Sequence, residues 1–201
     1  AYFYIRVMHQ NNQMIFIISR IFWLAAIKGD DGKALYSESF LNYLQRMKFT
    51  CDIDAIPEGT VVLPQEPLLR IKGPLIQILL LETFILNTLN FQTLIATKAA
   101  RIKEAGEKPF VELGLRRAQG FDVALSASRA SYGGGASYTS NVLAGKIYNI
   151  PKIGVLGHIW VTSFDSEVEA FESFADKIPN HSYMPVDTYN TEEGVENAIK
   201  L

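Results

Sequence analysis

The chain has 201 residues, of which 48% are hydrophobic and 20% are charged, so it can bury a core and does not have the composition of a disordered protein. Its formal net charge of −2 provides no overall positive field, which argues against a nucleic-acid partner. Cys51 is the only cysteine, so an intrachain disulfide and a multi-cysteine metal site are excluded, and a reducing, cytoplasmic location is predicted.

Two apolar stretches raise the question of a membrane span. Residues 14–27 are short and carry Arg20 near their middle; they could form a signal anchor, but no small-residue cleavage site follows them. Residues 75–97 are longer but contain several polar residues, among them Gln77 and Glu82. Because a span needs about 20 predominantly apolar residues, we predict a buried helix of a soluble protein for this second stretch and no membrane partner.

The first half of the chain predicts a small α+β domain. We leave residues 1–38 unassigned and place part of this domain in residues 39–109. The long helix predicted over residues 75–105 is apolar on nearly every side, so it is expected to be buried on every side and to connect this domain to the next. The predicted elements are a helix over 37–48 capped by Ser37 or Ser39, short strands over 49–56, 61–63 and 68–71, and that long helix over 75–105.

From Phe110 onward, predicted strands and helices alternate. Four units of a strand followed by a helix imply a parallel sheet or part of a (β/α)8 barrel. The predicted fold class is therefore α/β, with a partial, irregular (β/α) barrel over residues 110–201 after the small α+β domain. Half a barrel leaves an open sheet edge, so we expect a fragment whose further units follow Leu201. The predicted strands are 110–113, 136–138, 152–157 and 181–186, and the predicted helices are 121–131, 140–148, 164–177 and one from Thr191.

Residues that could bind an anion follow the first of these strands and precede the second helix. Arg116 and Arg117 offer planar guanidinium donors that suit phosphate oxygens, and two cations at a helix start suggest an anion partner. A plain surface pair is the alternative. Residues 132–141 form a glycine-rich loop leading to a helix start at Ser140 or Asn141, where backbone amides can approach an anion. The loop matches neither a Walker A nor a G-x-G-x-x-G pattern, so a flexible turn is the alternative.

His158 follows the predicted strand over residues 152–157 and is the candidate nucleophile. Neutral imidazole is nucleophilic near physiological pH and can accept a phosphoryl group on a ring nitrogen; a structural histidine is the alternative. Asp165 and Asp187 follow the third and fourth predicted strands. They could orient the imidazole, hold Mg²⁺ through water or contact ribose hydroxyls, or they could cap helices. No residue is assigned as a direct protein ligand of a metal.

Residues 39–201 contain a long ordered set of motifs. They are FLNYLQRMKFTCDIDAIPEGTVVLPQEPLLRIKGPL, LLETFILNTLNFQTLIATKAARI, ELGLRRAQG, ALSASRASY, TSNVLAGKIYNIP, GHIWVTSFDSEVEAF and VDTYNTEEGVENAI. This set resembles the nicotinate phosphoribosyltransferase family. In that family, the histidine of a G-T-x-A-H-S/E-W-like motif is transiently phosphorylated by ATP. The motif reads GVLGHIW here, so the resemblance implies a phosphohistidine at His158.

The resemblance implies the reaction of nicotinate with phosphoribosyl pyrophosphate to give nicotinate mononucleotide, a salvage step of NAD biosynthesis. It implies coupling to ATP hydrolysis, a requirement for Mg²⁺, and a homodimer whose sites are completed across the interface. His158 is the catalytic residue implied. The residues implied to bind substrate are Arg116, Arg117, Ser140, Asn141, Val155 and Asp187.

The sequence departs from the family pattern at three places. Val155 stands where the family has a threonine, and Ile159 where it has serine or glutamate. Residues 1–38 contain no counterpart of the family's tyrosine-bearing substrate segment. Two alternatives to the leading function stay open. One is a quinolinate phosphoribosyltransferase-like enzyme, with a related barrel but no ATP step. The other, which Val155 and Ile159 support, is an inactive truncated relative that serves only as a dimerising subunit.

Overall fold

The structure is a computed structural model that describes residues 21–180 and 183–201. The chain divides into two compact units, which meet between Thr93 and Leu94 inside helix α5 (Leu75–Ala105). The predicted strand-like start of residues 2–7 lies outside the described residues. The predicted domain ranges stay a prediction.

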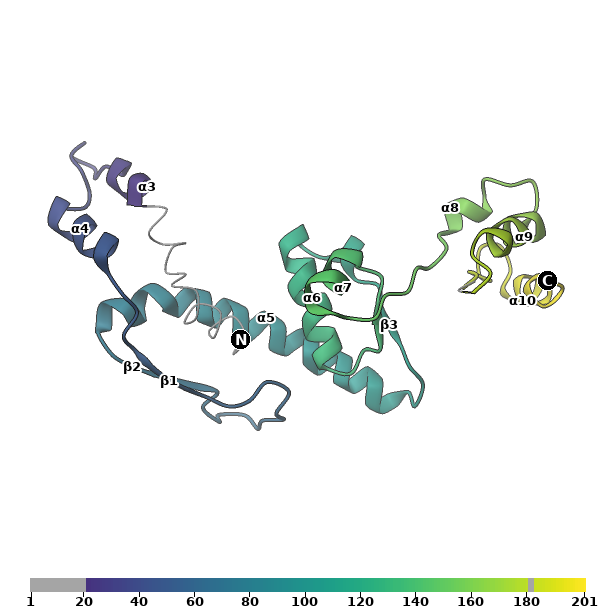
Figure 1. The fold of residues 1–201 in the computed structure, drawn as a ribbon, viewed down its shortest axis with the longest axis horizontal. Coiled ribbons are helices and arrows are strands. Elements are labelled where there is room, and N and C mark those ends of the chain that lie inside the picture. Colours follow the sequence, from purple (N-terminus) through teal and green to yellow (C-terminus); the bar gives the residue numbers. More distant parts are fainter. Residues whose placement is uncertain (1–20, 181–182) are drawn as a thin grey trace. The chain divides into compact units, whose positions relative to one another are not determined.

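Within its described residues, 21–93, the first unit contains two short helices, one antiparallel ribbon and the first half of α5 (Figure 1). Its short helices are α3 (Ile21–Ala26) and α4 (Glu38–Arg46), and its strands are β1 (Asp52–Ala55) and β2 (Leu69–Lys72). Ser37 caps α4, since its side chain accepts a hydrogen bond from the amide of Phe40 at 3.3 Å. The strands pair with Asp52 opposite Lys72, and an exposed ion pair joins Asp54 to Arg70 at 2.6 Å.

The predicted strand over residues 61–63 is wrong. These residues lie in the loop between β1 and β2, where they form no strand. Val61 and Leu63 are 92% and 68% exposed, so their apolar side chains contribute nothing to a sheet. The loop is bounded by a turn at Gly59, whose φ of 85° suits glycine, and it is followed by Pro64, which cannot donate to a strand ladder.

Gln77, near the start of α5, attaches the segment before β1 to this helix. Its side-chain oxygen accepts a hydrogen bond from the amide of Thr50 at 2.9 Å, and its nitrogen donates to the carbonyl of Lys48 at 3.0 Å. The same oxygen lies 3.5 Å from the thiol of Cys51. Burial and the neighbouring carboxylate of Asp52 raise the pKa of that thiol, so Cys51 stays protonated at neutral pH. A polar residue that sequence reasoning used against a membrane span therefore has a structural role.

Replacing Gln77 with leucine should lower the free energy of unfolding by about 2 kcal/mol, because the part-buried hydrogen bonds to the amide of Thr50 and the carbonyl of Lys48 are both lost. Asn87→Leu is the matched control. It makes the same kind of polar-to-leucine change on an exposed position of α5 and should stay within about 0.5 kcal/mol. Urea denaturation followed by circular dichroism measures both; equal effects for the two variants would contradict the anchoring role.

The prediction that α5 is buried on every side is wrong for the described chain. It is long and apolar enough, by length and composition, to cross a membrane, but only 17% of its most apolar 18-residue window is buried. Periodicity reports how apolar a helix is, whereas its burial depends on elements that pack against it. The described residues do not provide enough of these elements. The exposed apolar side chains of the helix are Leu75, Leu79, Phe84, Leu86, Leu94 and Ile102.

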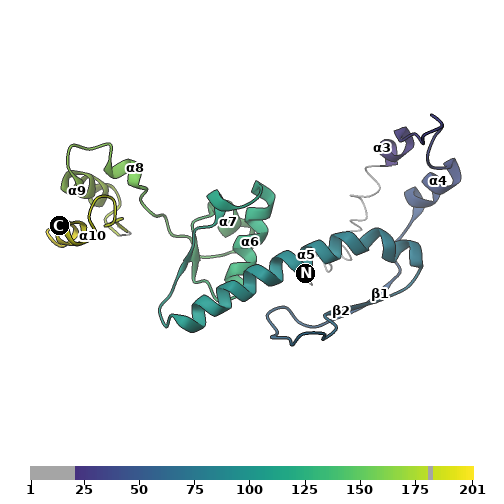
Figure 2. The ribbon, with the colours of Figure 1, turned by 180° about the vertical axis from the view of Figure 1, so that it is seen from behind.

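Three parallel segments lie side by side in the second unit, after the second half of α5. Strand β3 (Val111–Glu112) pairs in parallel with β4 (Tyr138–Thr139), and Thr139 forms a further parallel bridge to Lys152. Helices α6 (Phe121–Gly133) and α7 (Val142–Tyr148) connect them, and the second half of α5 contacts the end of α6 (Figure 2). The first two strands, their parallel direction and the connecting helices are thus as predicted.

The predicted barrel is not formed by the described residues. Beyond the bridge at Lys152, residues 153–157 form no strand, and residues 183–186 form none either; residues 181–182 lie outside the described part. The observed sheets have two strands each, so the fold shown is mixed α/β, mostly helical, with small sheets. A barrel closes only when eight strands complete the hydrogen-bonding ring, and this sequence predicts at most four in the region concerned.

The last part of the second unit is a small helical cluster. It contains α8 (His158–Val161), α9 (Glu167–Lys177) and α10 (Thr191–Ile199). Ser166 caps α9, accepting from the amide of Glu169 at 3.2 Å, as its capping-box spacing predicts. The core of this cluster includes Val161 and Phe171, both fully buried. His158 is the first residue of α8, the helix that contributes Val161 to this core.

Candidate active site

The arginine pair lies in a short turn after β3. Residues Leu115–Arg117 form one turn of 3-10 helix, η1, and helix α6 begins only at Phe121. The prediction that the pair opens an α-helix is therefore wrong, and the helix-dipole argument for an anion does not apply. Both side chains are exposed, and within the described residues neither guanidinium group makes a hydrogen bond or ion pair. They remain available to a phosphate.

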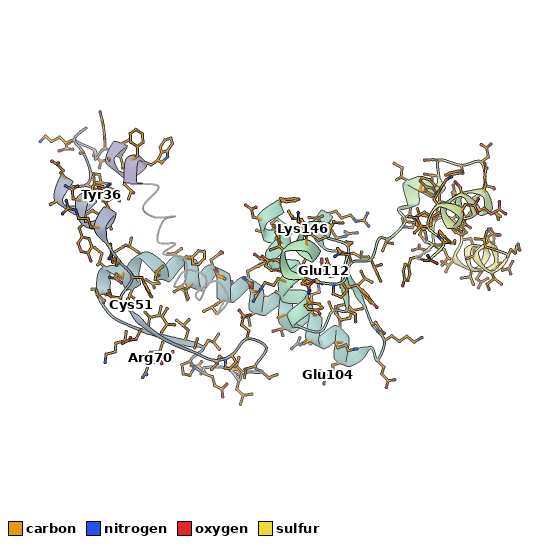
Figure 3. The ribbon with its side chains drawn as sticks, in the orientation of Figure 1. Tyr36, Cys51, Arg70, Glu104, Glu112 and Lys146 are labelled. Carbon is orange, nitrogen blue, oxygen red and sulfur yellow. The ribbon has the colours of Figure 1, made fainter. Side chains whose placement is uncertain are left out.

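The carboxylate of Glu112 lies at the end of β3, beside this turn (Figure 3). One of its oxygens accepts hydrogen bonds from the hydroxyls of Ser128 on α6 and Thr139 on β4, at 2.8 and 2.7 Å. The other accepts from the amide of Gly114, which directly precedes η1. A single side chain thus contacts three elements that meet at the carboxyl ends of the parallel strands, where α/β proteins place their binding residues.

Ser140 and Asn141 follow β4 and lead into α7. Asn141, not Ser140, is the cap: its side-chain oxygen accepts from the amide of Ala144 at 3.1 Å. Asn141 is 2% exposed, and its side-chain nitrogen has no hydrogen-bond partner among the described residues. Ser140 is half-buried, and its backbone amide donates to the carbonyl of Glu112 at 3.0 Å. The turn after β4 is thereby tied to β3.

His158 is the first residue of α8, with an exposed side chain. Its Nδ1 lies 3.1 Å from the hydroxyl of Thr188, and its Nε2 lies 3.9 Å from a carboxylate oxygen of Asp187. The hydroxyl of Thr188 also donates to the carbonyl of Pro185, at 3.4 Å. The hydroxyl can therefore accept a hydrogen bond from Nδ1–H. The imidazole lies within reach of a hydroxyl and a carboxylate and is still open to solvent on one side.

The remaining predicted residues differ in position. Val155 is 47% exposed and lies in the segment without secondary structure that precedes α8, while Ile159 is 80% exposed on α8 itself. Asp165 is exposed in the loop before α9 and, unlike Asp187, has no ion pair with His158. Of the two predicted aspartates, the structure therefore brings only Asp187 close to the histidine.

Comparisons with known proteins identify the family. A family model described as the nicotinate phosphoribosyltransferase (NAPRTase) N-terminal domain matches residues 8–90. A nicotinate phosphoribosyltransferase of Mycobacterium tuberculosis is 45% identical over 171 residues, which are 85% of this chain and 37% of that protein. One of Bacillus subtilis is 43% identical over 168 residues, 83% of this chain and 34% of that protein. The chain belongs to the nicotinate phosphoribosyltransferase family.

A solved structure agrees with this assignment. The crystal structure of human nicotinic acid phosphoribosyltransferase matches with a TM-score of 0.63 and 36% sequence identity, covering 76% of this chain and 32% of that chain. The chain thus spans about a third of the length of the curated relatives it matches.

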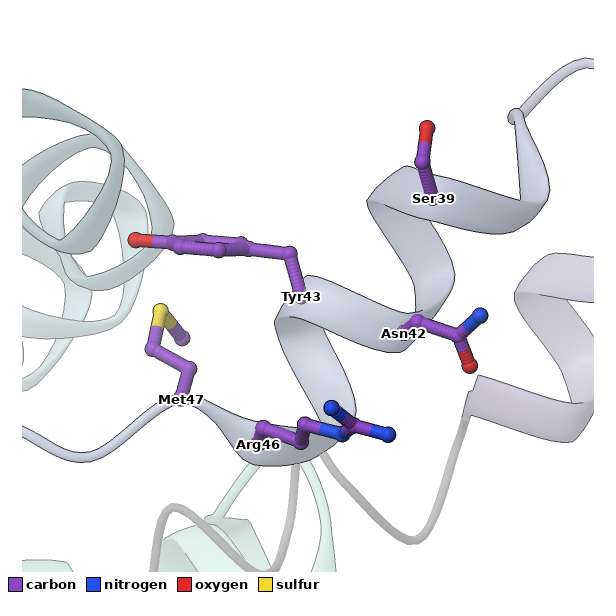
Figure 4. Close-up of a pocket in the computed structure, with 5 residues that line it drawn as sticks. All are labelled: Ser39, Asn42, Tyr43, Arg46 and Met47. Carbon is purple, nitrogen blue, oxygen red and sulfur yellow. The ribbon is translucent and has the colours of Figure 1, made fainter.

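The structure also contains a surface pocket on α4, away from any predicted site residue in the sequence (Figure 4). It belongs to the first unit, whereas every residue predicted to bind substrate lies in the second. The figure shows the side chains of Tyr43 and Met47 pointing to the same side of the helix. A pocket formed by one helix and the residue after it gives no enclosed ligand site, so we assign it no role in the family's reaction. Its lining residues are Ser39, Asn42, Tyr43, Arg46 and Met47.

Sequence reasoning missed two polar residues of the site. Glu112 was interpreted only as part of a strand, although a carboxylate between the apolar Val111 and Leu113 at a strand end is a usable signal. Thr188 follows Asp187 directly, but a hydroxyl contact to a histidine 30 residues earlier cannot be read from spacing. The structure brings the candidate residues together in two groups, one around Glu112 and one around His158.

The contact between Thr188 and His158 can be tested without activity. Thr188→Val removes the hydroxyl and keeps the side-chain size, so the Nδ1–H tautomer of His158 should lose roughly a fivefold preference. The ¹⁵N chemical shifts of the two ring nitrogens report this equilibrium. Thr162→Val, which removes an exposed hydroxyl bonded only to the carbonyl of Ile159, is the control and should leave both shifts unchanged. Unchanged shifts in Thr188→Val would show that the contact does not set the tautomer.

Proposed function

We propose that this chain carries the phosphohistidine and part of the phosphate-binding residues of a nicotinate phosphoribosyltransferase. Such an enzyme joins nicotinate to phosphoribosyl pyrophosphate, forming nicotinate mononucleotide, with ATP hydrolysis. The observation that carries the proposal is the geometry of His158: an exposed imidazole with Thr188 at Nδ1 and Asp187 near Nε2. Family membership supplies the reaction class, and this geometry supplies a nucleophile fit for the ATP-dependent step.

In the proposed ATP step, the lone pair of a ring nitrogen of His158 forms a bond to the terminal phosphorus of ATP. The bond from that phosphorus to the bridging oxygen breaks, and ADP leaves. Water later cleaves the nitrogen–phosphorus bond and releases orthophosphate. Thr188 fixes the orientation of the ring, and the Asp187 carboxylate can stabilise the positive charge that the imidazole carries after it has bound phosphorus.

In the proposed glycosyl transfer, the bond between ribose C1 and pyrophosphate breaks as the ring nitrogen of nicotinate bonds to C1. The transition state has oxocarbenium character, and negative charge accumulates on the leaving pyrophosphate. Arg116 and Arg117 are exposed and unpaired within the described residues, so both guanidinium groups can bind its oxygens. Ser140 and Asn141 contribute polar groups from the neighbouring strand end.

Mg²⁺ would be bound mainly by phosphate oxygens of the substrates. Among the described residues, no group of three or more His, Cys, Asp or Glu side chains could hold a metal ion. The exposed carboxylate of Asp187 is the protein group beside His158 that could contact the ion, directly or through water. When bound, the ion supplies positive charge to the transferring phosphoryl group. The homodimer and the cytoplasmic location remain predictions.

The proposal is tested on the complete gene product that carries these residues. It is incubated with phosphoribosyl pyrophosphate, Mg²⁺ and either nicotinate or quinolinate, with and without ATP, and the nucleotide products are separated by chromatography. We expect nicotinate mononucleotide, with more formed when ATP is present. Conversion of quinolinate without ATP would favour the quinolinate enzyme instead. No product together with no binding of phosphoribosyl pyrophosphate in calorimetry would point to an inactive subunit, for which the apolar Val155 and Ile159 already provide an argument.

A further inference from the structure

We propose that Glu112 is a positioning residue that fixes the positions of two segments at the strand ends: residues 114–117 with the arginine pair, and residues 140–141. The phosphate-binding role of these segments rests on the proposed function, but the positioning itself follows from contacts in the structure. Glu112 contacts neither segment's side chains and reaches both through backbone and hydroxyl groups.

The first connection runs from Glu112 to the arginine turn. One carboxylate oxygen accepts the hydrogen bond of the Gly114 amide, and the amide of Arg117 donates to the carbonyl of Gly114 at 2.9 Å to close the turn. A Cβ at position 114 would lie 2.7 Å from the same carboxylate oxygen, so any larger residue there would displace the carboxylate. The carboxylate therefore fixes the residue from which η1 begins.

The second connection runs from Glu112 to the turn after β4 through Thr139. The hydroxyl of Thr139 donates to Glu112 at 2.7 Å and accepts from the amide of Asn141 at 3.0 Å. Thr139 is fully buried, so no solvent replaces these bonds. Since the hydroxyl has one proton, its donation to the carboxylate leaves its lone pairs for the amide of Asn141. The carboxylate thus sets the direction of both bonds.

The buried hydroxyl of Ser128 completes the group. It lies 2.8 Å from Glu112 and 3.0 Å from the carbonyl of Ala124, and Ser128 is 1% exposed. The carboxylate accepts from the Gly114 amide and from both hydroxyls. A carboxamide that turns its oxygen to the Gly114 amide leaves the Thr139 hydroxyl without an acceptor, whereas Ser128 can turn its proton to the carbonyl of Ala124. In Glu112→Gln, either the amide or the hydroxyls would face an NH₂ group, at almost unchanged side-chain volume.

If Glu112 only stabilised the second unit, replacing it would not change hydrogen exchange specifically at the two strand ends. If Glu112 positions both segments, its replacement must also change exchange at the amide of Asn141, which does not touch Glu112 and reaches it only through Thr139. In Glu112→Gln, hydrogen exchange should become roughly tenfold faster at the amides of both Gly114 and Asn141, because each loses a hydrogen bond or its orientation. Thr139→Val should speed exchange at Asn141 and leave Gly114 protected.

The experiment measures residue-specific amide exchange by NMR on the complete gene product, together with thermal unfolding. Glu167→Gln is the matched control: its glutamate is buried and accepts from Asn197 at 3.0 Å, outside the strand-end group, so both amides should keep wild-type exchange. Unchanged exchange at Asn141 in Glu112→Gln overturns the proposal. If that variant does not fold, Glu112→Asp, which keeps the carboxylate but shortens the side chain by one methylene, decides: faster exchange at both Gly114 and Asn141 supports the coupling, and unchanged exchange at Asn141 refutes it.

Two functional readouts separate this proposal from the proposed function. Calorimetry with phosphoribosyl pyrophosphate should show about tenfold weaker binding in Glu112→Gln, while ATP-dependent phosphorylation of His158 stays at the wild-type level. A structural defect would lower both. If the wild-type protein binds no phosphoribosyl pyrophosphate, the proposed function fails, and the exchange pattern still accepts or rejects Glu112 as the residue that couples the strand ends.

Discussion

His158→Ala should reduce ATP-dependent phosphate incorporation into the complete gene product to background. The alanine variant has no ring nitrogen to accept the phosphoryl group. Thr188 and Asp187, which contact the imidazole, have no such nitrogen and do not replace it. The measurement uses ATP labelled with ³²P in the terminal phosphate and scores acid-labile label on the protein. Since His158 is exposed and outside the buried core of Val161 and Phe171, the fold should be preserved.

His9→Ala and His181→Ala are the controls for this experiment, because these two histidines complete the set of three in the chain. Both variants should incorporate label at the wild-type level. If acid-labile label persists in His158→Ala, or disappears in one of the controls, His158 is not the phosphorylated histidine. The stimulation of nucleotide formation by ATP should be lost in parallel with the label, leaving only the ATP-independent rate.

Local features of the fold could be predicted from the sequence because their causes are local. Ser37, Asn141 and Ser166 cap the helices that follow them, each through a side-chain oxygen and an amide two or three residues inside the helix. The parallel pairing of β3 with β4 followed from the helix between them, since parallel strands need such a crossover. The resemblance to the nicotinate phosphoribosyltransferase family rested on short sequence motifs, and the relatives from Mycobacterium tuberculosis and Bacillus subtilis confirm it.

Features that depend on distant partners could not be predicted. The burial of α5 requires elements that the described residues do not provide, and the sheet beyond Lys152 requires neighbouring strands. The site has the same limit: His158 contacts Thr188 across 30 residues, and Glu112 contacts Thr139 across 27. Sequence reasoning proposed His158 as the nucleophile from its motif, a prediction that the experiment above tests. The residues that contact His158 and the arginine turn emerged only from the structure.

A second large effect is expected at the junction between α6 and the second half of α5. Gly134→Ala should lower the free energy of unfolding of the second unit by about 3 kcal/mol. The backbone of Gly134, with φ −86° and ψ 1°, is accessible to alanine, so the cost is steric. The added Cβ would lie 2.3 Å from the carbonyl oxygen of Ala96 and 2.8 Å from the Cβ of Ala99, both of which belong to a helix that cannot yield locally.

Gly133→Ala, one residue earlier, provides the matched control with the opposite sign. A Cβ at Gly133 meets no atom within 4 Å, and the residue is the last of α6, so alanine should be neutral or stabilise by up to about 1 kcal/mol. Thermal unfolding separates the two, since a loss of this size lowers the midpoint by on the order of 10 °C. Equal midpoints would mean that α6 does not pack on α5 as described. The opposite signs at adjacent positions would instead show that the close approach of the end of α6 to the second half of α5 depends on one missing methyl group.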